Sequence, residues 1–279
     1  ETGLPWIAGV IFAAVVGYTV LRLKGAERSR MLVAEVLIFF SVLFWALFEQ
    51  AGSSLTLFAD QSTQMPAWFN AGYTQMFNPG IIIIGGPIMA ALWAFLAKRN
   101  LDPNPTLKFG LGLLQVGLGF MIVVWGAGMA NSAFQMPLLL LGLLYLFHTT
   151  GELFLSPVGL SEITKLSVAK VVSFMMAVWF LASSIAQYVG GWIAGLAGTE
   201  TVGGQVLNPA LALQTSLEVF KLLGLWGMGI GVAFVVVSFF IKGWSHGAND
   251  GGNHPGPDLT DRGQEDGNIA RPAATTGVH

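Results

Sequence analysis

Two glutamates lie within long apolar stretches of this chain. Glu152 follows the run LLLLGLLYLFHTTG, and Glu49 lies in FFSVLFWALFEQAGSSL, well past Arg30, the last basic residue before it. A carboxylate at the depth of a bilayer is unfavourable by several kcal/mol unless a partner, water or a proton compensates its charge. Both acids are therefore candidates for a functional site.

Polar side chains extend the helix face that carries Glu152. His148, Glu152 and Ser156 are spaced i, i+4, i+8 and share one face. A lone intramembrane histidine is usually structural, and no second metal ligand lies near His148 in the sequence. Each step along this face rises about 6 Å, so Ser156 cannot reach His148 without another helix. This spacing disfavours an intramembrane hydrolase built on serine, histidine and glutamate.

Aromatic side chains accompany the polar ones. Trp45 lies one turn before Glu49 on the same face, and Trp179 and Ser183 form another i, i+4 pair. Trp179 could be the wall of a pocket or part of a packed core, and the spacing leaves both interpretations open.

The segment FNPGIIIIGGPIMAALW carries Asn78 and two prolines, Pro79 and Pro87. Each proline removes a backbone donor and frees a carbonyl. Interrupted helices are tolerated at membrane depth where they line a cavity or are packed by protein. We expect an interrupted helix here, and Asn78 could hydrogen-bond a substrate or be a satisfied packing residue.

The composition indicates an integral membrane protein. Of 279 residues, 54% are hydrophobic and 10% are charged, whereas soluble domains have about 25% charged residues. The formal net charge of −2 argues against a nucleic-acid partner. The chain contains no cysteine, which excludes disulfides, thiolate metal sites and cysteine catalysis.

Helices long enough to cross a bilayer must position these residues. About 20 apolar residues span the hydrocarbon core, and no barrel-like alternation is present. Glycines at 191 and 195, and at 227 and 231, form small-xxx-small faces that permit close helix packing. The seven expected spans lie near residues 4–23, 31–59, 72–97, 107–130, 136–161, 169–196 and 214–241.

Basic residues give an orientation. Twelve of the 13 Lys and Arg residues fall on one side if the seven spans alternate, and only Lys221 lies elsewhere. The positive-inside rule makes that side cytoplasmic, with the N-terminus outside. Residues 246–279 are polar and rich in Gly and Pro, so we expect a disordered cytoplasmic tail. The twelve are Arg22, Lys24, Arg28, Arg30, Lys98, Arg99, Lys108, Lys165, Lys170, Lys242, Arg262 and Arg271.

Two buried acids on separate helices suit an ion-coupled transporter better than a purely structural membrane subunit. Glu49 has no basic residue in its own span, so a proton or a partner from elsewhere must compensate its charge. Such a group can load a proton in one conformation and release it in another.

Four segments resemble the C-terminal half of proton-coupled oligopeptide transporters of the major facilitator superfamily. They are FWALFEQAGSSL, NPGIIIIGGPIMAALW, GELFLSPVGLSEITKL and MMAVWFLASSIAQYVGG, and the resemblance covers residues 30–242. It implies an all-α membrane protein in which residues 31–245 form a six-helix bundle and residues 1–30 an extra transmembrane helix and linker. The chain is then expected to be part of a longer protein, whose N-terminal six helices would carry the family's E-x-x-E-R motif.

The resemblance implies proton-coupled symport of di- and tripeptides across a bacterial inner membrane by alternating access. The proton gradient supplies the energy, and no cofactor is expected. Implied partners are the peptide, protons, membrane lipid and the N-terminal half. Another small solute, such as nitrate or an amino-acid-like compound, is the alternative.

The resemblance also implies residue roles. Glu152 matches the acid that faces the amino group of the peptide, and Glu49 matches a buried acid assigned to proton coupling. Phe48 departs from members that have two adjacent acids at this place. The remaining residues expected to contact the substrate are Asn78, Ser156, Trp179, Ser183 and Trp45.

Overall fold

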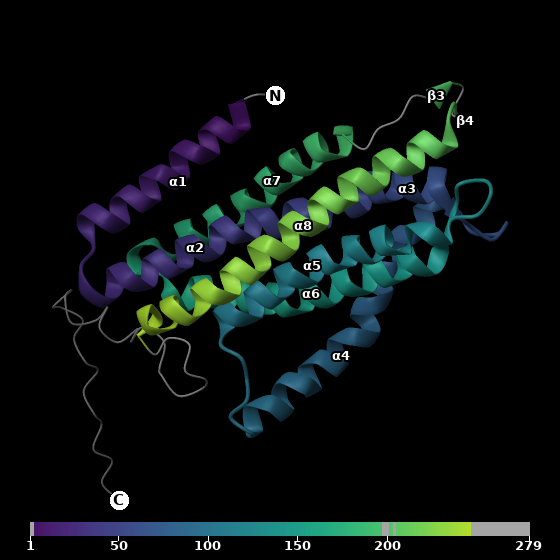
Figure 1. The fold of residues 1–279 in the computed structure, drawn as a ribbon. Helices are drawn as coiled ribbons and strands as arrows, with labels where there is room; N and C mark the ends of the chain where they lie inside the picture. Colours follow the sequence, from purple (N-terminus) through teal and green to yellow (C-terminus); the bar gives the residue numbers. More distant parts are fainter. Residues whose placement is uncertain (1–2, 197–200, 203–204, 247–279) are drawn as a thin grey trace, which may run out of the picture.

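The computed structural model describes residues 3–196, 201–202 and 205–246. The tail expected at 246–279 lies outside this range except for its first residue. Within the described residues, seven helical segments are long and apolar enough to cross a membrane. The seven expected spans are therefore confirmed. Figure 1 shows these segments running roughly side by side as a bundle.

The long helices follow the expected order, and short helices and two-residue strands, which were not expected, lie at the ends of the spans. The long helices are α1 (Gly3–Arg22), α2 (Gly25–Phe48), α4 (Phe77–Lys98), α5 (Pro105–Trp125), α6 (Leu138–Leu166), α7 (Val172–Leu196) and α8 (Pro209–Ile241). The shorter elements are η1 (Glu49–Gly52), α3 (Ser54–Ser62), β1 (Thr63–Gln64), η2 (Ala71–Met76), η3 (Gly126–Met129), β2 (Met136–Pro137), η4 (Ala169–Val171), β3 (Thr201–Val202), β4 (Gln205–Val206) and η5 (Lys242–Ser245).

One end of the bundle collects the basic connections. The turns from α1 to α2, from α4 to α5 and from α6 to α7 lie at the same end as the C-terminus of α8 (Figure 1). We call this the basic end. Arg30 of α2 donates a hydrogen bond to the Lys165 carbonyl of α6, and Lys108 forms an ion pair with Asp102 at 2.7 Å. The connections that carry the basic residues therefore lie at one end of the bundle, as the predicted alternation of the seven spans requires.

Helices α5 and α8 pack closely because both expose glycine at their contact. A Cβ added to Gly117 would overlap the backbone of Gly227 and Met228, and one added to Gly231 would overlap Leu114. The expected close packing at 227 and 231 is confirmed. At 191 and 195 no atom of the described residues lies within 4 Å of an added Cβ, so the described part of the chain does not pack against that face.

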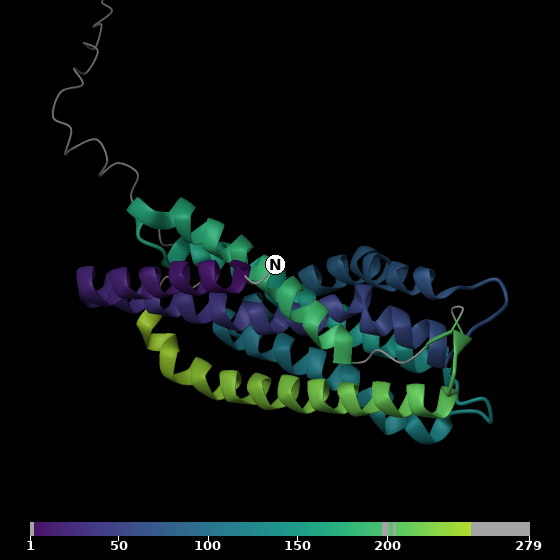
Figure 2. The ribbon, with the colours of Figure 1, turned by 90° about the horizontal axis from the view of Figure 1, so that it is seen from above.

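Helix α4 stands at the edge of the described bundle. It contacts α6 and η2, has no fully buried residue, and lies on the opposite side of the bundle from α8 (Figures 1 and 2). Pro79 falls in its first turn, where the missing donor is tolerated, and Pro87 lies inside a helix that continues to Lys98. The expected interruption is therefore absent from α4 itself, and the irregular backbone is η2, just before it.

Helix α1 docks on the bundle by a polar contact as well as apolar ones. The Thr19 hydroxyl of α1 donates a hydrogen bond to the carboxylate of Glu35 on α2. Both side chains are buried, at 0% and 3% exposure. Glu35 is thus a buried acid with a partner on the neighbouring helix.

Candidate functional site

Glu152 is half-buried on α6 where that helix meets α4. The amide nitrogen of Asn78, in the first turn of α4, donates a hydrogen bond of 2.8 Å to Glu152 Oε2. The same nitrogen lies 3.2 Å from the hydroxyl of Thr149, which is fully buried. The structure therefore brings together two residues that the sequence analysis proposed for one site, and it fixes the Glu152 carboxylate through a neutral donor.

Sequence reasoning did not select Thr149 and Tyr145. Thr149 lies one turn before Glu152, and Tyr145 lies one turn before Thr149, so all three share a face of α6. Tyr145 is 1% exposed, and its hydroxyl donates a 3.3 Å hydrogen bond to the Ala51 carbonyl. The i, i+4, i+7 spacing of Tyr145, Thr149 and Glu152 was the sequence signal that could have identified them.

Glu49 lies at a break in the second span rather than inside a continuous helix. Helix α2 ends at Phe48, a 3-10 turn covers Glu49–Gly52, and α3 begins at Ser54. Ser53 between them has φ −134° and ψ −95°, outside the helical region. The Glu49 side chain is half-buried and has no hydrogen-bond partner among the described residues.

Side-chain hydrogen bonds hold the backbone at and beside this break. The buried Gln50 amide donates to the Ala46 carbonyl at 2.9 Å and to the Gly190 carbonyl of α7 at 3.2 Å. Ser54 donates to Gln50 Oε1 at 2.7 Å. The freed Ala51 carbonyl accepts from Thr56 as well as from Tyr145. The break is therefore a specified feature, tied to α7 and to α6.

The two acids influence each other without touching. Glu49 and Glu152 are close enough for their charges to repel. Neither carboxylate forms an ion pair with a cation in the described part of the chain. The charge of this pair is therefore left to be compensated from outside the described residues.

The other proposed site residues are placed on the surrounding helices. Trp45 packs edge-on against Phe48, with ring centroids 5.4 Å apart, and its buried indole nitrogen has no partner among the described residues. Trp179 of α7 is 6% exposed and packs on Gly159, two turns beyond Glu152 on α6. Ser156 and Ser183 are half-buried, and neither side chain makes a hydrogen bond within the described residues.

His148 belongs to the packed core. It is 1% exposed, its Nε2 lies 3.1 Å from the Val116 carbonyl of α5, and its ring packs on Phe120 at a centroid distance of 4.8 Å. No hydrogen bond joins it to Ser156 or Glu152 in the described part of the structure. No group of three or more potential metal ligands occurs in the part of the chain that the structure describes.

Comparisons with known proteins agree on one family. The family model described as POT family matches residues 7–210. The dipeptide and tripeptide permease A of Chromobacterium violaceum is 30% identical over 251 residues, which cover 86% of this chain and 48% of the permease. The di-/tripeptide transporter of Lactococcus lactis subsp. lactis is 30% identical over 230 residues, covering 80% of this chain and 43% of that transporter.

The fold is also similar to solved structures. A crystal structure of a mutant peptide transporter POT in complex with alafosfalin superposes with a TM-score of 0.71 at 27% identity. The match covers 88% of this chain and 48% of the solved one. The chain therefore spans about half the length of the curated relatives and solved structures that it matches.

Proposed function

Since the chain belongs to the POT family, we propose that it forms the C-terminal half of a proton-coupled symporter of di- and tripeptides. The named relatives that support this proposal are a dipeptide and tripeptide permease and a di-/tripeptide transporter. The N-terminal six helices of the same protein are its partner in this proposal. The protein would work by alternating access in a bacterial inner membrane.

The observation that carries the proposal is the half-buried Glu152 carboxylate held by Asn78. A peptide in solution is a zwitterion, so its binding site needs an anion near one end and a cation near the other. Glu152 supplies the anion, and Asn78, a neutral donor, keeps it oriented through a hydrogen bond of 2.8 Å. A peptide ammonium group can approach the carboxylate because no cation of the described chain is paired with it. The cation for the peptide carboxylate is assigned to the N-terminal half.

Glu49 is the proposed proton-coupling residue. Its carboxylate has no hydrogen-bond partner in the described residues and is exposed to the repulsion of Glu152. A bound proton on Glu49 removes that repulsion, and its release restores it. Because a change of charge at this place alters contacts between two rocking halves, it can bias the equilibrium between their arrangements.

Ser156, Trp179, Ser183 and Trp45 are proposed to line the peptide site on α6, α7 and α2. The basic end is proposed to be cytoplasmic, following the positive-inside rule. Residues 1–30 are proposed as the extra transmembrane helix and its linker, residues 31–245 as the transporter bundle, and 246–279 as a cytoplasmic tail.

Uptake by the full-length protein in proteoliposomes tests the function. An imposed inward proton gradient should drive accumulation of a labelled dipeptide above its external concentration, and an uncoupler should abolish that accumulation. Excess unlabelled tripeptide should compete. Failure of di- and tripeptides to compete, with competition by nitrate or a single amino acid instead, would contradict the peptide assignment. Accumulation that persists with the uncoupler would contradict proton coupling.

A further inference from the structure

Lys221 on α8 is the basic residue that departs from the charge pattern of the chain. The helical rise of about 1.5 Å per residue places it about 30 Å from Ile241 along the helix, which matches the thickness of a hydrocarbon core. The intervening residues 222–241 contain no ionisable side chain, and Lys242 follows them directly at the basic end. The two lysines therefore bracket one membrane thickness, with Lys221 at the boundary opposite the basic end.

Exposed tryptophans support the placement of Lys221 at the membrane boundary. Trp125, the last residue of α5, is 64% exposed, and Trp226 lies just over one turn from Lys221 and is also exposed. Tryptophan is enriched at the boundary between hydrocarbon and headgroups. Lys221 is thus placed where an ammonium group can reach lipid phosphates.

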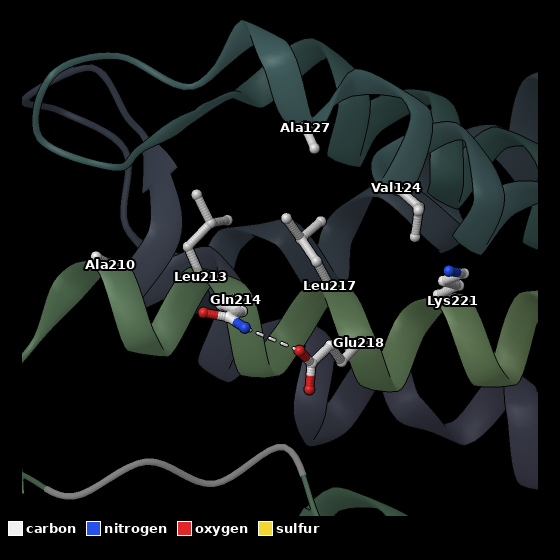
Figure 3. Close-up of a pocket in the computed structure, with 8 residues that line it drawn as sticks. All are labelled: Val124, Ala127, Ala210, Leu213, Gln214, Leu217, Glu218 and Lys221. Atoms are coloured by element: carbon white, nitrogen blue, oxygen red, sulfur yellow. Dashed lines mark hydrogen bonds between the residues drawn. The ribbon is translucent and has the colours of Figure 1, made fainter.

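A pocket lies directly outside this boundary, between the first turns of α8 and the end of α5. It has a volume of about 270 Å³. Figure 3 shows Val124 and Ala127 facing Leu213 and Leu217 across it, with Lys221 at one end. The remaining lining residues are Ala210, Gln214 and Glu218. The walls are apolar, and one charge of each sign lies at the rim.

The two charges of the pocket do not neutralise each other. Glu218 accepts a 3.0 Å hydrogen bond from Gln214 (Figure 3). Lys221 has no ion pair or hydrogen bond among the described residues. Both side chains are exposed. A cation and an anion of the protein are therefore available to an external group that carries both charges.

We propose that this pocket binds the headgroup of a zwitterionic phospholipid with a primary amine, phosphatidylethanolamine, in the leaflet opposite the basic end. Lys221 pairs with the lipid phosphate, and Glu218 accepts hydrogen bonds from the lipid ammonium. Val124, which lines the pocket beside Lys221, contacts the glycerol, and Leu217, farther from the hydrocarbon, contacts the methylene groups of the ethanolamine.

The order of charges along α8 matches this lipid. Lys221 lies about 4.5 Å deeper than Glu218 along the helix axis. In the lipid the phosphate lies next to the glycerol and the amine lies farther from the hydrocarbon, so each group meets the opposite charge. An anionic lipid without an amine would leave Glu218 facing negative charge. A choline headgroup cannot donate a hydrogen bond to Glu218.

Native mass spectrometry of the purified, delipidated full-length protein tests this site. The probes are phosphatidylethanolamine, phosphatidylcholine and phosphatidylglycerol with identical acyl chains. Lys221→Gln should weaken phosphatidylethanolamine binding about fivefold, the effect of about one interfacial lysine. Lys242→Gln, which removes the matching charge at the other end of α8, is the control and should leave this binding unchanged. Lys221→Arg should retain it.

Glu218→Gln tests the amine contact. It should reduce the preference for phosphatidylethanolamine over phosphatidylglycerol while leaving the protein folded, as judged by its melting temperature. Equal effects of Lys221→Gln and Lys242→Gln would overturn the proposal, as would an unchanged lipid preference in Glu218→Gln. If glycerophosphoethanolamine, the headgroup without acyl chains, competes as well as the lipid, the site takes a soluble phosphate and the lipid assignment is wrong.

Discussion

Glu152 and Glu49 are two acids at membrane depth that the chain holds in opposite ways. Glu152 lies inside the unbroken helix α6 and accepts a hydrogen bond from Asn78 on α4. Glu49 lies at the helix break after α2 and has no hydrogen-bond partner in the described residues, although its neighbour Gln50 is bonded to α7. The Glu152 carboxylate is held in position by a hydrogen bond. The backbone at Glu49 is held by its neighbours, but the Glu49 side chain is unpaired within the described residues.

This difference matches the two proposed tasks. A group that recognises a peptide ammonium must hold its geometry, because a misplaced carboxylate loses binding energy. A group that loads and releases a proton gains from having no fixed partner that favours one protonation state. Substitutions at each acid and at its neighbours test whether the two roles are separate.

Glu49→Gln should have the largest effect. The variant cannot lose a proton, so the accumulation ratio of a labelled dipeptide under a proton gradient should fall to about one. Exchange of internal for external peptide needs no net proton movement and should persist in part. Glu35→Gln is the matched control, because Glu35 is a buried acid in the same span that is bonded to Thr19. Accumulation by the Glu49→Gln variant would remove Glu49 from the coupling step.

Glu152→Gln should have the next largest effect, and a selective one. Hydrogen bonds to charged groups contribute about 1.5–3 kcal/mol, so the affinity for dipeptides with a free amino terminus should fall about tenfold or more. The affinity for N-acetylated dipeptides should change much less. Competition against labelled dipeptide binding to the purified full-length protein measures both. An equal loss for the two ligand classes would contradict the assigned contact.

Asn78→Leu should weaken peptide binding less than Glu152→Gln. It removes the donor that orients Glu152 but leaves the carboxylate that pairs with the peptide ammonium group, so the expected loss of affinity is about tenfold or less. Thr149→Val is the control, because it keeps the bond between Asn78 and Glu152. A loss in Asn78→Leu that exceeds that of Glu152→Gln would show that Asn78 acts on the peptide independently of the carboxylate.

Tyr145→Phe should have the smallest effect. It removes a 3.3 Å hydrogen bond to Ala51 at the break beside Glu49 and a contact with the Thr74 side chain, while Thr56 still donates to the Ala51 carbonyl. The expected loss is about 1 kcal/mol or less, seen as a small decrease in melting temperature with peptide accumulation retained. Tyr188→Phe on the exposed face of α7 is the control. Loss of accumulation in Tyr145→Phe alone would mean that this hydroxyl is needed for transport.

The spans could be predicted from the sequence because their signal is local. A run of about 20 apolar residues needs no knowledge of its neighbours, and the alternating basic connections supplied a second, independent count. The pairing of Asn78 with Glu152 also followed from the sequence, through the family resemblance rather than through spacing.

The break at Glu49 could not be predicted in the same way. It depends on Gln50 reaching the Gly190 carbonyl on another helix, a contact between residues far apart in the chain. Gly191 and Gly195 show the reverse case, since their spacing favours close packing but no helix packs against them in the described structure. Which face of a helix meets a neighbour is set by the whole bundle.

Proton entry coupled to peptide transport tests most directly whether Glu49 carries the proton and Glu152 binds the peptide. Proteoliposomes that contain a pH-sensitive dye and the full-length protein are given an inward dipeptide gradient, and internal acidification is followed for Glu49→Gln and Glu152→Gln. We expect no peptide-dependent acidification in Glu49→Gln even where peptide exchange continues. In Glu152→Gln we expect acidification to persist at raised concentrations of peptide. Acidification that survives in Glu49→Gln and is lost at every peptide concentration in Glu152→Gln would contradict the account and assign the proton to Glu152.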